Sequence, residues 1–205
     1  MEKKISSAVI RRMPRYYRHL DELRLEGVER ISSEVLAGKM GLTASQVRQD
    51  FNCFGGFGQQ GYGYNVKTLL QSIASILHID KGHTAVLVGV GNLGRALLRN
   101  FHFDTCGFTV TGAFDPAPEQ IGRTIGSTVI RPLAELEEFV RTSHPDIAIL
   151  TLPGSAAREM AAQLAEWGIR GIWNFTNIDL HLELSQIPVE NVHFSESLMV
   201  LSYRL

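Results

Sequence analysis

The fold is decided by the stretch Val86-Leu-Val-Gly-Val-Gly-Asn-Leu-Gly94, in which an apolar run enters a Gly-x-Gly-x-x-Gly loop. Residues 95–101 follow with helical spacing, and a second apolar run, residues 108–114, ends at Asp115. Asp115 comes about 20 residues after Gly94, which is the place of the acid in a dinucleotide fingerprint. A strand, a glycine turn, a helix and an acid at this distance predict a βαβ unit that binds a dinucleotide.

Each glycine of the loop has its own expected task. Gly89 permits the tight turn, Gly91 lets the backbone approach a pyrophosphate, and Gly94 allows the helix to pack closely on the strand. Unpaired N–H groups at the helix N-terminus attract the phosphates. Asp115 can accept hydrogen bonds from ribose hydroxyls and would repel a 2′-phosphate, which favours NAD and NADH over NADP. The predicted cofactor-binding residues of this unit are Gly89, Val90, Gly91, Asn92, Leu93, Gly94 and Asp115. The alternative is a glycine turn with a purely structural role.

Strands and helices keep alternating after Asp115, which predicts a Rossmann-type, doubly wound parallel sheet of the α/β class. The expected strands are 127–131, 146–152 and 169–175, and the expected helices are 132–142 and 154–167. Ligands of such sheets bind beyond the carboxyl ends of the strands. Thr151, Leu152 and Pro153 lie at one such end and are predicted to line the nicotinamide side. We assign this domain to residues 81–190.

Residues 1–80 have the pattern of a separate helical domain. A first helix is expected to begin at Pro14 and to end at Gly27. Ser32 or Ser33 can cap a short second helix, and the expected inward-facing residues of that helix are Val35, Leu36 and Met40. Thr43-Ala-Ser-Gln46 has the form of a capping box and opens a third helix. Helix, short helix, glycine-bearing turn and capped helix predict a helix-turn-helix.

The third helix carries polar residues that can read bases. Arg48 suits guanine in a major groove, and Gln46 or Gln49 suits adenine. An ordinary solvated helix face is the alternative for this segment. Residues 54–64 follow with five glycines and four aromatic residues, which predicts a wing whose tip can enter a minor groove. A structural hairpin with core aromatics is the alternative for the wing.

Charge supports a polyanionic partner for this first domain. The net charge of the chain is only −1, but basic residues gather near its start, and Glu2 is the one acid before Asp21. The partner we expect is double-stranded operator DNA. The predicted DNA-binding residues are Arg11, Arg12, Arg15, Ser45, Gln46, Arg48, Gln49, Gln59, Gln60, Gly61 and Tyr62.

Several classes of function are disfavoured. No apolar run approaches the roughly 20 residues that cross a bilayer, and no export signal is recognised, so we expect a cytoplasmic protein without a membrane partner. Two cysteines are too few for a disulfide framework, and no residues have metal-ligand spacing. None of the seven histidines has the setting of a dehydrogenase base, so we expect no catalytic residue and no enzyme. A small NAD-dependent oxidoreductase with an N-terminal dimerisation domain remains the alternative, and a module binding CoA or another nucleotide is a third reading.

Residues 191–205 form a third segment, with a short strand and an amphipathic helix. The helix carries Leu198, Met199, Leu201 and Tyr203, and so much apolar surface must dock somewhere. It can dock on its own domain or on a second subunit. The sequence does not decide between the two.

The motifs together resemble one known family. Ile31-Ser-Ser-Glu-Val-Leu-Ala37, Val47-Arg-Gln-Asp-Phe51, the glycine-rich wing, Val88-Gly-Val-Gly-Asn-Leu-Gly-Arg-Ala-Leu97 and Gly171-Ile-Trp-Asn-Phe175 occur in the order found in the redox-sensing transcriptional repressor Rex. The resemblance implies a homodimer that binds operator DNA in its apo or NAD form and releases the DNA when NADH accumulates. It also implies a C-terminal helix exchanged between subunits.

Several features depart from the family pattern, and the C-terminal helix sequence, residues 195–203, is one of them because it lacks the usual Asp-Leu. Gln59 and Gln60 stand where the family often has Lys-Arg at the wing tip, and Gln49 stands where it has Lys. Without these cations, the protein should bind DNA phosphates more weakly, and its DNA affinity should depend less on salt concentration. The family commonly has a tyrosine near Asn100 and Phe101 that senses the reduced nicotinamide, and this chain has none there.

Overall fold

The computed structural model describes residues 5–57, 62–180 and 187–205 of the 205-residue chain. Its contacts divide the chain into two compact units, Met1–Lys81 and Gly82–Leu205. Each unit has its own hydrophobic core. The two units are therefore described separately.

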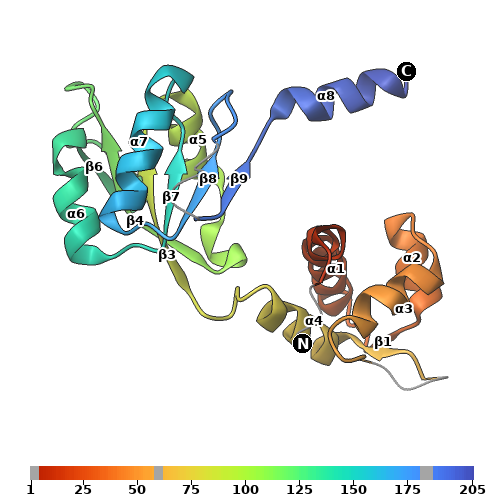
Figure 1. Cartoon of the computed structure of the whole chain (residues 1–205). Coiled ribbons are helices and arrows are strands. Elements are labelled where there is room, and N and C mark those ends of the chain that lie inside the picture. The colour runs from red at the N-terminus through yellow and green to blue at the C-terminus, as the bar shows by residue number, and fades with distance from the viewer. Residues whose placement is uncertain (1–4, 58–61, 181–186) are drawn as a thin grey trace. The chain divides into compact units, whose positions relative to one another are not determined.

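Unit 1 is a helix-turn-helix with a small two-stranded sheet. Its helices are α1 (Ser7–Leu25), α2 (Ser33–Met40), α3 (Ala44–Asn52) and α4 (Val66–Ile76), which are shown in Figure 1. Strands β1 (Arg30–Ile31) and β2 (Tyr64–Asn65) pair antiparallel at the base of the wing. Gly63 has φ +68°, and a Cβ there would lie 2.6 Å from the carbonyl oxygen of Ile31, so only glycine fits where the wing returns.

Short polar side chains cap α2, α3 and α4, and those of Ser32 and Thr43 do so as expected. Ser32 Oγ accepts a hydrogen bond from the Val35 amide, Thr43 Oγ1 from the Gln46 amide, and Asn65 Oδ1 from the Thr68 amide. These bonds satisfy backbone donors that a helix start leaves unpaired. The capping box is only half formed, because the side chain of Gln46 turns to Asp50 instead of back to Thr43.

Two expectations for unit 1 were wrong. The first helix begins at Ser7, with Ser6 as its cap, and Pro14 lies inside it. Pro14 is exposed and costs the helix one backbone hydrogen bond, because proline has no N–H. Burial of Met13 and Tyr16 on the other side of α1 stabilises the helix enough to offset that lost bond. Val35 is 55% exposed rather than inward-facing, because Leu36, Ala37 and Met40 form the buried side of α2.

Unit 2 contains the parallel, doubly wound sheet that the sequence predicts. The strand order is β5-β6-β4-β3-β7-β8-β9, and all neighbours are parallel except β5 and β6. The strands are β3 (His83–Val88), β4 (Phe108–Asp115), β5 (Thr124–Ile125), β6 (Thr128–Pro132), β7 (Ile147–Leu150), β8 (Gly171–Asn174) and β9 (Val189–Asn191). The chain runs outward from β3 to β4 and β6, then returns to β7 on the other side of β3. The order therefore reverses at the carboxyl end of β3, where ligands of such sheets bind.

Alternate residues of β3 enter different cores. Val86 and Val88 pack with α6 (Leu136–Ser143) and α7 (Gly154–Trp167) on one face of the sheet. Ala85 and Leu87 pack on the other face, which α5 (Asn92–Asn100) covers. Figure 1 shows α6 and α7 together on one side of the strands. Pro132 ends β6 and a 3₁₀ turn (Leu133–Glu135) follows, so the expected helix from Pro132 begins later, at Leu136.

The last helix, α8 (Phe194–Tyr203), extends away from the sheet of unit 2 (Figure 1). None of its residues is buried. Its apolar side chains are exposed, with Leu198 at 67% and Leu201 at 53%. Within the described ranges, no helix has the length and apolar character needed to cross a membrane.

Candidate functional site

The glycine loop lies at the reversal point of the sheet. β3 ends at Val88, and the Gly89 amide donates to the carbonyl oxygen of Phe114 on the neighbouring strand at 2.8 Å. Gly91 is the N-cap of α5 and provides no side-chain hydrogen bond. The first amides of α5 therefore face the end of the strands without a side-chain cap, as an anion-binding helix start requires.

The three glycines occupy different surroundings. Gly89 has φ +95°, and a Cβ there would lie 2.9 Å from Leu152 Cδ2. A Cβ on Gly94 would collide with the carbonyl oxygen of Gly89 and lie 2.9 Å from Thr151 Oγ1. A Cβ on Gly91 would meet nothing within 4 Å. Gly89 and Gly94 thus serve close packing, while the backbone at Gly91 borders open space.

Asp115 ends β4 beside this loop and is 7% exposed. One carboxylate oxygen accepts a hydrogen bond from the Val90 amide, and the other accepts from the Ala117 amide at 2.8 Å. The carboxylate thus ties the glycine loop to the end of β4. Each carboxylate oxygen can accept a second hydrogen bond, so these contacts leave Asp115 able to accept from a ribose hydroxyl.

Thr151, Leu152 and Pro153 follow β7 and line the other side of the loop. The Thr151 hydroxyl donates to the carbonyl oxygen of Gly89. Leu152 faces Gly89, and Pro153 is the N-cap of α7. The structure therefore brings these three residues together with the fingerprint glycines.

On α3 the exposed predicted residues are Ser45, Arg48 and Gln49. One nitrogen of the Arg48 guanidinium donates to Ser33 Oγ at 3.0 Å, which joins α3 to the first turn of α2. Tyr62, next to the wing, is 70% exposed. Gln59, Gln60 and Gly61 lie outside the described residues.

The predicted residue Arg12 has partners inside unit 1. Its Nε and Nη2 donate to the two oxygens of Asp50 at 2.7 and 2.8 Å. Tyr16 Oη and Gln46 Nε2 donate to the same carboxylate at 2.9 and 2.8 Å. Burial alone would raise the pKa of Asp50, but the hydrogen bonds from Arg12, Gln46 and Tyr16 outweigh it and hold that pKa below its usual value.

The other predicted arginines of α1 differ from Arg12. Arg15 donates to the carbonyl oxygen of Met40 at 3.0 Å, and so pairs with the last turn of α2. Arg11 is exposed on α1.

Sequence reasoning missed Ser33, Tyr16 and Asp50 as partners of the predicted residues. Tyr16 and Asp50 are 34 positions apart, and no local pattern joins them. Gln46 and Asp50 are four positions apart on one helix, a spacing at which such side chains pair, so this contact had a readable signal.

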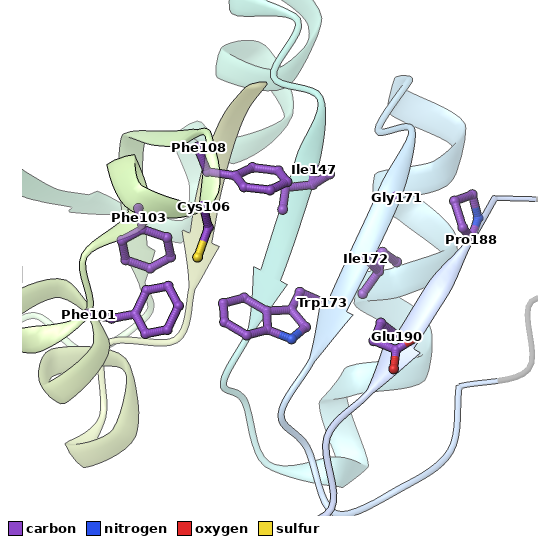
Figure 2. A pocket seen from close by; sticks show the side chains of 10 residues that line it. All are labelled: Phe101, Phe103, Cys106, Phe108, Ile147, Gly171, Ile172, Trp173, Pro188 and Glu190. Carbon is purple, nitrogen blue, oxygen red and sulfur yellow. The ribbon is translucent and has the colours of Figure 1, made fainter. Parts of the chain in front are cut away.

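An apolar pocket of about 360 Å³ lies on the α5 side of the sheet and was also missed. Figure 2 shows Phe101, Phe103 and Trp173 turned toward one another at its wall. The ring centroids of Phe101 and Trp173 are 5.4 Å apart. Of the described α-helices, only α5 contributes side chains to the core on this face. Phe101 belongs to this aromatic group, near the place where the resemblance implies a tyrosine.

No group of three or more His, Cys, Asp or Glu residues that could hold a metal ion occurs among the described residues. His83 and His193 each lie beside one carboxylate, Asp146 at 3.7 Å and Asp179 at 2.9 Å. Neither pair lies at the glycine loop, since His83 begins β3 and His193 precedes α8.

Comparison with known proteins divides the chain in a similar way. Residues 4–52 match the family described as "Putative DNA-binding protein N-terminus", and residues 80–178 match the "CoA binding domain" family. A redox-sensing transcriptional repressor Rex from Clostridium botulinum strain Alaska E43 is 49% identical over 99% of this chain and 96% of its own length.

Two solved structures are similar over almost the whole chain. The protein RSP in complex with β-NAD+ and operator DNA has a TM-score of 0.92 and 46% identity, over 98% of this chain and 93% of RSP. RSP in complex with β-NADH has a TM-score of 0.90 and 42% identity, over 98% of this chain and 94% of RSP. The fold of this chain is therefore similar to that of RSP over almost its whole length.

Proposed function

The chain belongs to the Rex family of redox-sensing transcriptional repressors, and from this premise we propose which of its residues carry each part of that function. The protein is a repressor and not an enzyme: it binds operator DNA, and NADH releases the DNA. One observation carries the assignment. A helix-turn-helix with an exposed polar face and a glycine loop with open space at Gly91 occur in one chain. We place the protein in the cytoplasm, where the operator and the NAD pool are found.

The dinucleotide is held by Gly89, Gly91, Gly94 and Asp115. The amides at the start of α5 receive the pyrophosphate, because Gly91 leaves the approach open. The Asp115 carboxylate accepts hydrogen bonds from a ribose and disfavours a 2′-phosphate. Thr151, Leu152 and Pro153 line the adjacent side of the loop. The ligand supplies a nicotinamide ring whose positive charge is lost on reduction, and this difference is the signal.

Operator DNA is bound by the exposed side of α3 and by the wing. Arg48 is the strongest candidate for direct reading, because its guanidinium can donate two hydrogen bonds to a guanine. Ser45 and Gln49 lie on the same exposed side. Gln59, Gln60, Gly61 and Tyr62 supply the wing contacts, with fewer cations than the family usually has there. Arg11 supplies a phosphate contact from α1.

The repressor acts as a homodimer through α8. The apolar side of this helix has no buried residue within its own chain. A parallel sheet normally has both faces covered, and the pocket beside Trp173 lies on the less covered face. A second copy of the chain supplies the missing cover, with α8 exchanged between the copies. Two recognition helices then bind two half-sites of one operator.

A gel-shift titration tests the function. Duplex selected from a random library by the wild-type chain is bound in the presence of NAD, and NADH is then added. We expect NADH at micromolar concentration to release the DNA and NADPH to be much weaker. Equal DNA binding with and without NADH would overturn the sensing role. Hydride turnover with a simple substrate would support the oxidoreductase alternative.

A further inference from the structure

Asp50 lies under the exposed side of α3 and is fully buried. Its two oxygens receive four hydrogen bonds from three side chains, each 2.7 to 2.9 Å long. Two of these partners, Arg12 and Tyr16, lie one turn apart on α1. A buried carboxylate with a donor at each oxygen is a strong and geometrically specific anchor. The anchor joins α3 to α1 at one defined rotation of the helix.

Gln46 is part of this anchor. Its Nε2 donates to Asp50 Oδ1, so the side chain turns toward the interior and is half-buried. Reading an adenine requires both the amide nitrogen and the amide oxygen of a glutamine at the base edge. The bond to Asp50 uses one of the two N–H donors of Gln46 and holds the amide against a buried carboxylate, whereas the side chains of Arg48 and Gln49 are exposed.

Arg48 shows the opposite arrangement. It is exposed, and its hydrogen bond to Ser33 lies at the surface of unit 1. Gln49 is exposed beside it. Arg48 lies on the same helix as Asp50, two positions away, so the anchor at Asp50 also fixes the direction in which Arg48 points. A small rotation of α3 about its axis would move the Arg48 guanidinium away from a base edge. Groups that read bases must be held to within about half an ångström.

We propose that Asp50 and Gln46 are positioning residues that set the rotation of the recognition helix, and that base reading is left to Arg48 and Gln49. The proposal rests on the proposed function, because it concerns how α3 meets DNA. It differs from the prediction from sequence, in which Gln46 or Gln49 reads adenine and Arg12 binds DNA. Here Arg12 holds Asp50 from α1, and Gln46 holds it from within α3.

Base-preference profiles distinguish positioning from reading. Each full-length variant selects duplexes from a random library, and fluorescence anisotropy then measures its affinity for the wild-type consensus and for each single-base change. We expect Arg48→Ala to lose preference at one base pair in each half-site. We expect Gln46→Ala to keep the wild-type consensus at every position and to bind it about 3- to 10-fold more weakly. Gln49→Ala is the matched comparison: it removes an exposed glutamine from the same helix, and we expect it, unlike Gln46→Ala, to lose preference at one base pair.

A double-mutant cycle tests whether Gln46 acts through Asp50. We expect Asp50→Asn to weaken binding about tenfold for all sequences, and Gln46→Ala to add less than twofold to that loss in the double variant. NADH affinity, which belongs to unit 2, should stay within twofold of wild type in both variants and shows that unit 2 is folded; the dispersion of the unit 1 amide signals in the nuclear magnetic resonance spectrum shows that unit 1 is folded.

Each outcome bears on a definite claim. A position at which Gln46→Ala, unlike Asp50→Asn, loses preference would show that Gln46 reads a base and would overturn the proposal. Losses that multiply in the double variant would overturn it too. A wild-type chain that selects no consensus would instead overturn the proposed function. Nuclear magnetic resonance of the DNA-free protein then tests the anchor alone: we expect the Gln46 side-chain amide signals to shift on Asp50→Asn, and unchanged signals would contradict the anchor.

Discussion

The guanidinium of Arg48 on α3 donates a hydrogen bond to the hydroxyl of Ser33 in the first turn of α2, at a distance of 3.0 Å. The bond joins the two helices of the helix-turn-helix through a side chain that we expect to contact DNA. Arginine has many rotamers, and holding it before binding lowers the entropy lost on contact. The hydrogen bond from Arg48 to Ser33 thus holds the guanidinium in place before the protein contacts a base.

We expect Ser33→Ala to weaken operator binding by about 2- to 5-fold, because a single exposed hydrogen bond contributes about 0.5 to 1 kcal/mol. The loss should be larger for the preferred base pair of Arg48 than for other positions. Fluorescence anisotropy on the operator and its single-base variants measures both effects. Ser33→Thr keeps the hydroxyl and is the control. An equal loss in Ser33→Thr and Ser33→Ala would contradict the role of the hydrogen bond.

Gly91 and Gly94 provide a second prediction, because alanine at each site meets different surroundings. Gly91 has φ −69°, and a Cβ there meets nothing within 4 Å, so Gly91→Ala should fold with unchanged or slightly higher stability. The same methyl group would occupy the approach to the pyrophosphate, and NADH affinity should fall at least tenfold. Gly94→Ala should instead lower the free energy of unfolding by about 1 to 3 kcal/mol, because its Cβ collides with Gly89.

Thermal unfolding measures the stability of both variants, and NADH fluorescence titration measures their NADH affinity. The decisive comparison is a stable Gly91→Ala protein that does not bind NADH. If that variant binds NADH as wild type does, the dinucleotide does not cross the loop at Gly91.

Much of this fold could be predicted from short-range signals. The caps Ser32, Thr43 and Asn65 act within three residues of their partners, and the strands of unit 2 are apolar runs between turns. The family comparisons and the sheet order confirm the α/β class with an N-terminal DNA-binding unit. The start of α1 was misplaced because proline is a usual first residue of a helix, whereas here the buried side of α1 decides.

The candidate site was less accessible to sequence reasoning. The glycines and Asp115 could be located because their chemistry depends on spacing along the chain. The contact of Arg12 with Asp50 could not be predicted, because the two residues are 38 positions apart. In the sequence, Arg12 cannot be distinguished from an arginine that faces solvent. The pocket beside Trp173 is formed by the starts of several strands, which only the sheet order brings together.

Asp146 gives a prediction about pH. The Thr84 amide donates to one of its oxygens at 2.9 Å and Arg170 donates to the other at 2.6 Å, and these contacts hold the pKa of Asp146 below its usual value despite partial burial. A carboxylate whose pKa is lowered by folding stabilises the protein above the unfolded pKa, near 4, and loses that contribution as the pH falls through the folded pKa.

We therefore expect Asp146→Asn to lower the free energy of unfolding by about 1.5 to 3 kcal/mol at pH 7, the range for a hydrogen-bonded charge, and by less at pH 3. Urea unfolding at the two pH values measures the difference. Glu137→Gln is the control, because Glu137 pairs with Arg141 in an exposed i, i+4 contact of small effect. A loss of equal size at both pH values would contradict the assigned role of the charge.

The exposed helix α8 gives the last prediction. Phe194, Leu198 and Leu201 lie on one side of it and are all more than half exposed. Leu198→Glu should leave the stability of the single chain unchanged, because no contact inside the chain buries Leu198. It should convert a dimer into a monomer in light scattering, since a charge would enter an apolar interface. Tyr203→Glu places the same charge on the opposite side of α8, where Tyr203 is 92% exposed, and should remain dimeric.

Operator affinity should fall with the loss of the dimer. A monomer contacts one half-site, whereas two linked recognition helices bind with a high effective concentration for the second half-site. We expect at least a hundredfold loss for Leu198→Glu on the full operator and little change on an isolated half-site. A dimeric Leu198→Glu protein with wild-type affinity would show that the copies associate through another surface.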